Sequence, residues 1–364
     1  MSLSIPNQSS KLGSLRVSAN ILQVADRRAD SRRPNPLAAR AFKPALKPRL
    51  RTWLALALVA FSSARWSAQA GNPPPENLEK FRIAFSAGIL GEVNRNDATA
   101  AILVWGQIVT GQRKLRTEAI PMVFDGSDEL FSALQDGTID AATVLTEEYF
   151  AHPLTAAPDG LFLGSKGGKI TEQYVLLVRQ GGTIQDIASL KGHSLELHQS
   201  PRTSLAPAWL DTLLALHKLG LLEDLFSKTT RLDKVSRVIN RLFFRQSDAC
   251  VVTREAFETA AELNPQVGKE LRVLATSGEV VPSFFFFRAG LAPGLRKALE
   301  EAVLNVHTTA PGKQAMTVFQ LERLEKHPLS CLDSARDLLV ERARLRGTGQ
   351  EKGKVAAITS DAHP

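Results

Sequence analysis

The sequence is poor in cysteine: only Cys250 and Cys331 occur among 364 residues, and their spacing matches no metal-ligand pattern. This excludes a cysteine-based metal site. The two thiols are able to pair in an oxidising compartment, but nothing in the sequence places them close together. We therefore expect two independent, partly buried thiols.

The sequence also lacks the short motifs of common catalytic and cofactor sites. No G-x-S-x-G elbow, H-E-x-x-H helix or dinucleotide-binding glycine fingerprint occurs. The run Gly164–Lys169 is close to a phosphate loop, but Leu163 replaces its first glycine and Ile170 replaces the Ser or Thr that reaches magnesium. We expect a polar surface loop at this position.

Two pairs of titratable residues are candidates for a catalytic or metal site. His193 and His198 flank one predicted strand at an odd spacing, which puts them on opposite faces and disfavours joint metal binding. Glu147 and Glu148 are able to form an acid/base pair, although adjacent carboxylates in a loop are usually solvated. We expect no enzyme activity, no cofactor and no metal.

Basic charge is missing from most of the chain although the formal net charge is +8. Residues 1–70 hold twelve Lys or Arg and two acids, a net charge of +10, so the remainder carries −2. A nucleic-acid-binding protein needs its basic residues on the folded surface. The distribution therefore excludes nucleic acid as a partner.

Residues 1–70 form an N-terminal extension that ends in an export signal. Three cations at positions 47–51 precede the apolar run Trp53–Phe61, and Ala68–Ala70 supplies the small residues of a signal-peptidase site. The run is shorter than the roughly 20 residues of a membrane-spanning helix. We expect cleavage after Ala70 and a periplasmic protein, with a short membrane anchor or a buried helix as the alternative.

Beyond a proline-rich linker at 71–78, strands and helices alternate in an order that predicts a parallel sheet covered on both faces. The expected elements are the strand Arg82–Ser86, the helix Asp97–Thr110, the strand Ala119–Phe124, a helix capped at Asp125–Ser127 and the apolar strand Ile139–Leu145.

The alternation restarts further along the chain, which predicts a second lobe. The expected elements are strands at 174–178, 194–197, 248–252 and 271–275, a short helix capped at 183–186, and helices at 203–219 and 235–243. A buried strand at 284–287 and helices from Pro293 and from Ser334 to about Leu345 follow. We predict a first lobe of 79–173 and 284–346, a second lobe of 174–283, and a disordered tail at 347–364.

The segment Ser200–Ser204 is a candidate anion site because it follows a strand and opens a long predicted helix. The first turn of a helix offers unpaired N–H groups and a partial positive charge, and neighbouring hydroxyls add donors. The alternative is ordinary helix capping by Thr203 or Ser204.

Several stretches in one order resemble the phosphonate-type solute-binding proteins of ABC transporters. Gly137–Ala142 followed by Tyr149 resembles the family's "G-x-I-D-x-A…Y" stretch, Ala188–Gly192 its "D-L-K-G-K" turn, and Asp248–Cys250 its second "D-A-G" strand. Residues 271–277, Pro282, the phenylalanine strand and Pro311–Gly312 follow the closing pattern of the family. The resemblance covers about residues 80–325.

This resemblance implies the two-lobed type II periplasmic-binding-protein fold, an α/β fold whose two mixed, mostly parallel sheets are joined by two crossover strands. It also implies a phosphonate- or phosphate-like ligand in the cleft, an ABC permease as partner, and a monomer. Two departures concern the ligand. Arg202–Leu205 stands where the family has Ser-Thr-Ser-Gly, and Thr146–Glu148 replaces small residues. Carboxylates in the cleft repel a doubly charged phosphonate unless they face solvent or hold an ammonium group.

Two functions from different classes follow. The first is a solute-binding protein that closes on its ligand by a hinge motion, with a related alternative in which closure signals to a receptor or sensor kinase. The second is a periplasmic enzyme with Glu147 as base. For binding, the expected ligand contacts are Ser86, Thr146, Tyr149, Ser200, Arg202, Thr203, Ser204 and Asp248.

Overall fold

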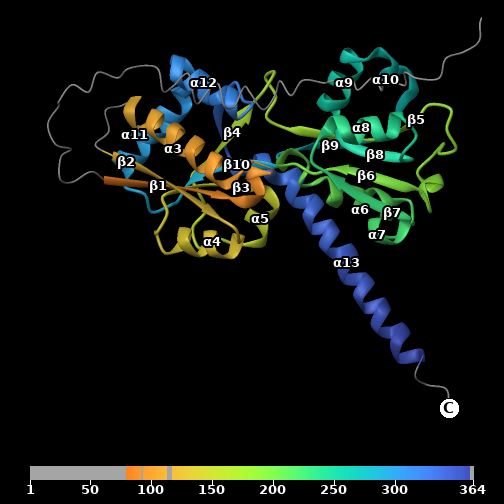
Figure 1. Ribbon diagram of the computed structural model, residues 1–364. Coiled ribbons are helices and arrows are strands. Elements are labelled where there is room, and N and C mark those ends of the chain that lie inside the picture. The colour runs from red at the N-terminus through yellow and green to blue at the C-terminus, as the bar shows by residue number, and fades with distance from the viewer. Residues whose placement is uncertain (1–78, 92, 113–116, 361–364) are drawn as a thin grey trace, which may run out of the picture. The chain divides into compact units, whose positions relative to one another are not determined.

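The structure, a computed structural model, describes residues 79–91, 93–112 and 117–360, all within the compact unit Pro73–Pro364. For residues 112 and 348–360 it describes the backbone only. The predicted extension, signal peptide and linker at 1–78 lie outside these residues. The described chain forms an α/β fold of two mixed sheets, as the sequence predicts (Figure 1).

The first sheet has the order β11-β4-β10-β3-β1-β2. Its strands are β1 (Glu79–Ser86), β2 (Thr117–Phe124), β3 (Ala141–Leu145), β4 (Leu161–Ser165), β10 (Ser283–Phe287) and β11 (Arg323–His327). β1 pairs in parallel with β2 and β3, whereas β10 and β11 run antiparallel to their neighbours. β3 is nearly all apolar because helices cover the sheet on both faces.

Helices on the two faces of the first sheet cover two separate apolar clusters. One cluster packs under α3 (Arg95–Gln112), α11 (Pro293–Asn305) and α12 (Ala310–Val318), and the other under α4 (Ser127–Gln135). Shorter helical turns connect these elements: α2 (Ala87–Leu90), α5 (Thr146–Ala151), the 3₁₀ helix η3 (Val306–Thr308) and the 3₁₀ helix η4 (Leu329–Leu332).

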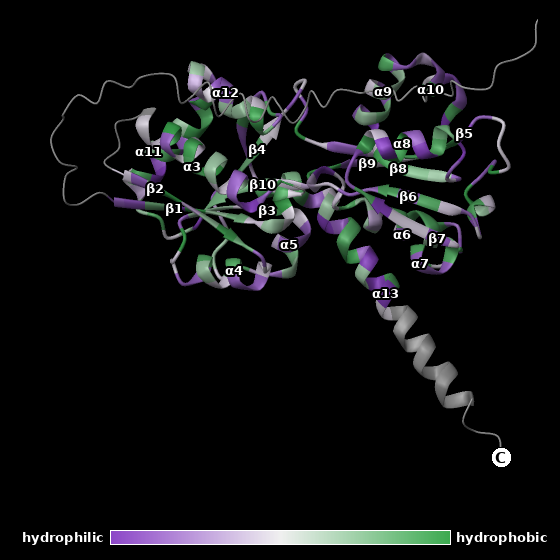
Figure 2. Ribbon diagram, viewed as in Figure 1, coloured by the Kyte–Doolittle hydropathy of each residue, from purple (hydrophilic) through white to green (hydrophobic). Residues whose placement is uncertain are grey.

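The second sheet has the order β7-β6-β8-β5-β9. Its strands are β5 (Glu172–Arg179), β6 (Ser194–His198), β7 (Lys228–Leu232), β8 (Ala249–Thr253) and β9 (Leu271–Val280). β6 pairs in parallel with β7 and β8, and β5 runs antiparallel to β8 and β9. Figure 2 shows most of β8 in green, as expected for a central strand whose two faces are buried.

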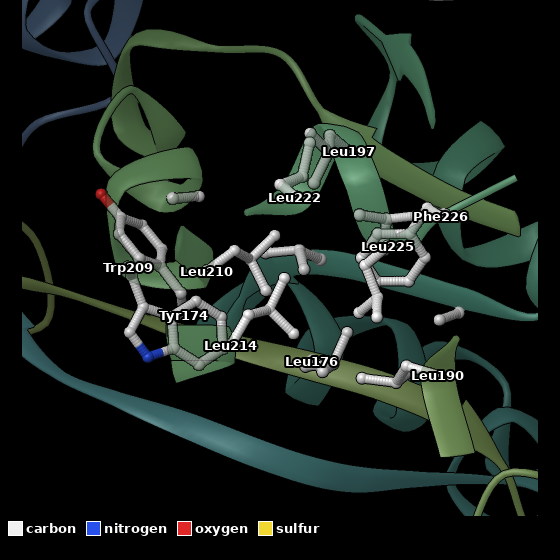
Figure 3. Packing of buried hydrophobic residues seen from close by; sticks show 14 of the residues in the cluster. Tyr174, Leu176, Leu190, Leu197, Trp209, Leu210, Leu214, Leu222, Leu225 and Phe226 are labelled. Atoms are coloured by element: carbon white, nitrogen blue, oxygen red, sulfur yellow. The ribbon is translucent and has the colours of Figure 1, made fainter. Parts of the chain in front are cut away.

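Helices again cover the second sheet. α6 (Ala206–Leu216) and α7 (Leu222–Leu225) pack over the cluster in Figure 3, where Leu210 and Leu214 of α6 meet Leu176 of β5. The other cluster is covered by α8 (Val235–Phe243), α9 (Arg254–Leu263) and α10 (Pro265–Glu270). Two 3₁₀ turns, η1 (Ala188–Leu190) and η2 (Pro201–Thr203), precede β6 and α6.

The chain passes from the first sheet to the second between β4 and β5, and it returns between β9 and β10. The division into lobes at 79–173, 174–283 and 284–346 that move as separate bodies stays a prediction.

Three local expectations were wrong. The surface loop expected at Gly164–Lys169 is exposed only at Lys166–Lys169, whereas Gly164 and Ser165 end the strand β4, because the apolar run Leu161–Leu163 fits between β10 and β11. The short helix at 183–186 is replaced by η1, whose first backbone N–H groups Asp186 helps to cap. α6 begins at Ala206 rather than Thr203, after the separate turn η2 that Pro201 opens.

The C-terminal helix also differs from the expectation. α13 (Asp333–Ser360) continues beyond the predicted end near Leu345, through the segment expected to be disordered from Gly347. A glycine costs only about 1 kcal/mol within a helix, and strong helix formers follow. The start of α13 packs on the second sheet, with Ala335, Leu338 and Leu339 in its cluster, although the sequence assigned it to the first lobe.

Both cysteines are free, as predicted, but Cys250 is fully rather than partly buried because it lies in the central strand β8. Among the described helices, none combines the length and apolar composition that a membrane crossing requires.

Candidate functional site

A cavity of about 650 Å³ lies where strands of both sheets end. The first sheet contributes Ala87 and Gly88, which follow β1, and Leu145 and Glu147 at the end of β3. The second sheet contributes residues 197–207 around the end of β6 and residues 231–237 between β7 and α8. The carboxyl ends of parallel strands are where α/β sheets bind ligands, so the fold places the cavity at a functional edge.

The turn after β6 supplies three hydroxyls to the cavity wall: Ser200, Thr203 and Ser204. Thr203 Oγ1 accepts from the Ser200 backbone N at 3.1 Å and donates to the His198 carbonyl at 2.6 Å. Ser204 Oγ is buried and has no hydrogen-bond partner in the described structure. Thr203 therefore holds the turn together, whereas the hydrogen-bonding capacity of the buried Ser204 Oγ is unused among the described residues.

Arg202 does not line the cavity, although the sequence predicted it as a ligand contact. Its Nε donates to Glu172 of β5, and its Nη2 donates to Glu255 of α9. Glu255 also pairs with Lys166 at 2.7 Å. The guanidinium is thus already paired with two carboxylates, and we assign it a structural role that joins η2 to its neighbours.

The first-lobe residues predicted to bind ligand do not line the cavity either. Ser86 accepts from the Gly88 N at 3.1 Å, capping α2, and donates to the Glu148 carboxylate. Thr146 donates to the Val281 carbonyl at 2.6 Å, and the Tyr149 ring packs edge-on against Phe284. Successive helical residues point about 100° apart. In α5, Thr146 is therefore buried and Tyr149 partly buried, while Glu147 borders the cavity.

Asp248 lies at the opposite edge of the second sheet, immediately before β8. Its carboxylate accepts from the Ser194 backbone N at 2.9 Å and the Ser194 hydroxyl at 2.7 Å, at the start of the neighbouring parallel strand β6. Asp140, before β3, accepts from the Arg82 N in the first sheet in the same way. Asp140 and Asp248, which lie in two of the stretches that resemble the family, therefore hold the starts of neighbouring strands together. They lie at the opposite ends of these strands from the cavity.

Burial alone would raise the pKa of Asp248, but the hydrogen bonds from Ser194 and the nearby His193 hold it below its usual value. Replacing Asp248 with alanine is expected to lower the free energy of unfolding by about 1–2 kcal/mol at neutral pH. Because the folded-state pKa is lowered, this contribution is present above the unfolded pKa of about 3.9 and is lost as the pH falls through the folded pKa. Urea unfolding at neutral and acidic pH measures it. A loss of ligand affinity in this variant would contradict the structural role.

Arg231 and Arg237 border the cavity and were missed by the sequence analysis. Arg231 lies in the edge strand β7, and Arg237 lies in the first turn of α8. Both side chains are exposed, and neither forms an ion pair with another described residue. β7 is polar and was not recognised as a strand, so the sequence gave no reason to place Arg231 at a strand end. The only available signal was the density of basic residues between Lys228 and Arg245.

Two further titratable groups line the cavity. The pKa of Glu147 is raised, mainly by burial and in part by the nearby Glu148 carboxylate. The guanidiniums of Arg342 and Arg231 act in the opposite direction and lower this pKa. Glu148, in contrast, is bonded to Ser86 and to the Leu145 backbone N. Burial lowers the pKa of His198, which favours a neutral ring at neutral pH, and its Nε2 lies 3.1 Å from the Asp233 carbonyl oxygen.

A cavity of ligand size, bordered by the strand ends of two α/β sheets, has the features of a binding site for a small molecule. The family model described as "ABC transporter, phosphonate, periplasmic substrate-binding protein" matches residues 112–328, more than half of the chain. The chain belongs to this family. It is therefore a periplasmic substrate-binding protein that works with an ABC transporter. No curated protein sequence matches it significantly.

Solved structures with the same fold are distant in sequence. XAC2383 from Xanthomonas citri, bound to chloride, has 14% identity and a TM-score of 0.55 over 74% of this chain and 99% of its own. The binding protein of an ABC phosphonate transporter from Pseudomonas aeruginosa has 12% identity and a TM-score of 0.50, over 78% and 99%. PhnD1 from Prochlorococcus marinus, in complex with methylphosphonate, has 15% identity and a TM-score of 0.50, over 72% and 97%. At these identities the likeness concerns the fold.

Proposed function

We propose that the cavity captures a small tetrahedral oxyanion of the phosphonate or sulfonate type for delivery to an ABC permease. The observation that carries this proposal is the pair Arg231 and Arg237, two guanidiniums at the cavity that form no ion pair with a described residue. Guanidinium is the side-chain group best suited to bind oxyanions through paired hydrogen bonds.

The neighbouring hydroxyls support the same ligand class. Ser204 Oγ is a buried donor without a partner among the described residues, and a buried polar group is normally hydrogen-bonded. Ser200 and Thr203 border the same wall. An oxyanion at this wall therefore gives Ser204 an acceptor and gives both arginines a counter-charge. Among the contacts expected from the sequence, we retain these three hydroxyls and replace the remainder with Arg231 and Arg237.

Catalysis is the less favoured function. Covalent catalysis needs a nucleophile activated by an adjacent base, and Ser204 Oγ makes no hydrogen bond to a described residue. The family works in transport, which favours a permease over a sensor kinase as the partner. We further propose that the protein acts as a monomer and that export ends with cleavage after Ala70.

The proposal is tested by titration calorimetry of the purified protein with methylphosphonate, methanesulfonate and inorganic phosphate, with methylammonium as a cationic control. We expect binding of at least one oxyanion and none of the cation. A ligand at a hundred times its Kd raises the free energy of unfolding by about 2.7 kcal/mol, so the melting temperature should rise with the same oxyanion. Binding of methylammonium alone would contradict the proposal.

A further inference from the structure

The charged groups that border the cavity bear on the charge of the ligand that it binds. Arg231 and Arg237 contribute two positive charges from the second sheet, and Glu147 contributes one negative charge from the first. Within the described residues none of the three forms a hydrogen bond or ion pair through its side chain. Asp233 also borders the cavity and contributes a second carboxylate, from the loop between β7 and α8.

The position of Glu147 distinguishes it from the neighbouring carboxylates. Glu148 accepts two hydrogen bonds and caps α5, and Glu172 and Glu255 both bind Arg202. Glu147 is half-buried and borders the cavity. The groups that act on it electrostatically are Arg342 of α13, Glu148 of α5 and Arg231 of β7. Burial raises the pKa of Glu147, and the two guanidiniums oppose this shift.

Two carboxylates, Glu147 and Asp233, therefore border the cavity together with the two guanidiniums. A second negative charge on the ligand is repelled by the Glu147 carboxylate, and no further guanidinium among the described lining residues offsets it. Uncompensated charge in a partly desolvated site is costly, because the attraction that offsets desolvation is absent.

We infer that Glu147 is a specificity-determining residue that makes the cavity select singly charged over doubly charged oxyanions. This inference rests on the proposed function, since it concerns the same oxyanion site. Such a cavity binds a sulfonate, or a phosphonate that retains one proton, more tightly than the fully ionised phosphonate.

The experiment compares methanesulfonate with sulfate, two tetrahedral oxyanions that carry one and two charges and do not titrate near neutral pH. Calorimetry gives the ratio of their Kd values for the native protein and for Glu147→Gln, which keeps the shape of the side chain and removes its charge. We expect the native protein to prefer methanesulfonate, and Glu147→Gln to shift the ratio toward sulfate by roughly three- to tenfold. Methylphosphonate at alkaline pH, where it carries two charges, should gain affinity in the same variant.

Glu118→Gln is the matched control, because Glu118 is exposed in β2, does not border the cavity and gives the same change in net charge. The ratio of the methanesulfonate Kd to the sulfate Kd for this variant should equal the ratio for the native protein. Glu147→Ala provides a second test if the glutamine variant folds poorly. An unchanged ratio in both Glu147 variants overturns the inference alone. Failure of both oxyanions to bind the native protein overturns the proposed function and this inference with it.

Discussion

Replacing Arg231 with glutamine is expected to weaken oxyanion binding by about tenfold to a hundredfold. Arg231 borders the cavity and has no ion-pair partner among the described residues, so its hydrogen bonds are available to the ligand. A hydrogen bond to a charged group contributes about 1.5–3 kcal/mol, which corresponds to this change in affinity. Calorimetry with the tightest oxyanion of the native protein measures the effect, and Arg237→Gln should act in the same direction.

Arg202→Gln is the control for this prediction, because it removes the same charge from a guanidinium that already binds Glu172 and Glu255. Its affinity should remain within about threefold of the native value, while its stability falls because two carboxylates lose their partner. If Arg202→Gln lost affinity and Arg231→Gln did not, the ligand would bind at the start of η2, and our assignment of the anion site would be wrong.

Replacing Asp211 with alanine is expected to lower the free energy of unfolding by about 3–5 kcal/mol, the usual cost of removing one partner from a buried ion pair. The Asp211 side chain is 1% exposed. Its carboxylate accepts from the Leu222 N at 3.1 Å, from Arg342 Nε at 3.0 Å and from Arg346 Nη2 at 3.3 Å. The substitution therefore removes the charge that binds α13 to α6. Urea unfolding followed by Trp209 fluorescence gives the difference.

Asp125→Ala serves as the comparison, since Asp125 pairs with Arg95 at 2.6 Å on the surface, where the two side chains are 77% and 51% exposed. Exposed ion pairs contribute at most about 1 kcal/mol. A similar loss of stability in both variants would show that burial is not the reason for the importance of Asp211.

The core strands could be predicted from the sequence because their residues are apolar regardless of what surrounds them. Ala141–Leu145 and Phe284–Phe287 are nearly continuous apolar runs, and both are buried strands of the first sheet. The amphipathic segment Val235–Phe243 likewise forms α8. The edge strand β7 carries no such signal, because its side chains are mostly polar. The internal strand β4 has an apolar run of only three residues, Leu161–Leu163, which follows a glycine and leads into a turn of lysines and glycines. Neither strand was recognised.

The functional edge of the molecule could be predicted only in part. Ser200, Thr203 and Ser204 line the cavity because a polar turn after a strand and before a helix lies at a strand end in any α/β fold, and their contact with a ligand stays a prediction. The predicted charged residues Arg202 and Asp248 do not line it. A charge is available to a ligand only when no neighbour has already neutralised it. Arg202 meets two carboxylates that are distant in sequence, and Asp248 binds a strand start at the other edge of the sheet.

The sequence by itself determined the α/β alternation, the apolar core strands and the family, because periodicity and composition are local properties of the chain. The tertiary structure decided which charges face the cavity. Arg231, Arg237 and Glu147 come together from β7, α8 and α5 only when the two sheets are assembled. Whether a charge is available to a ligand depends on every charged or polar neighbour around it. Those neighbours lie up to about two hundred residues away along the chain, as Arg342 does from Glu147.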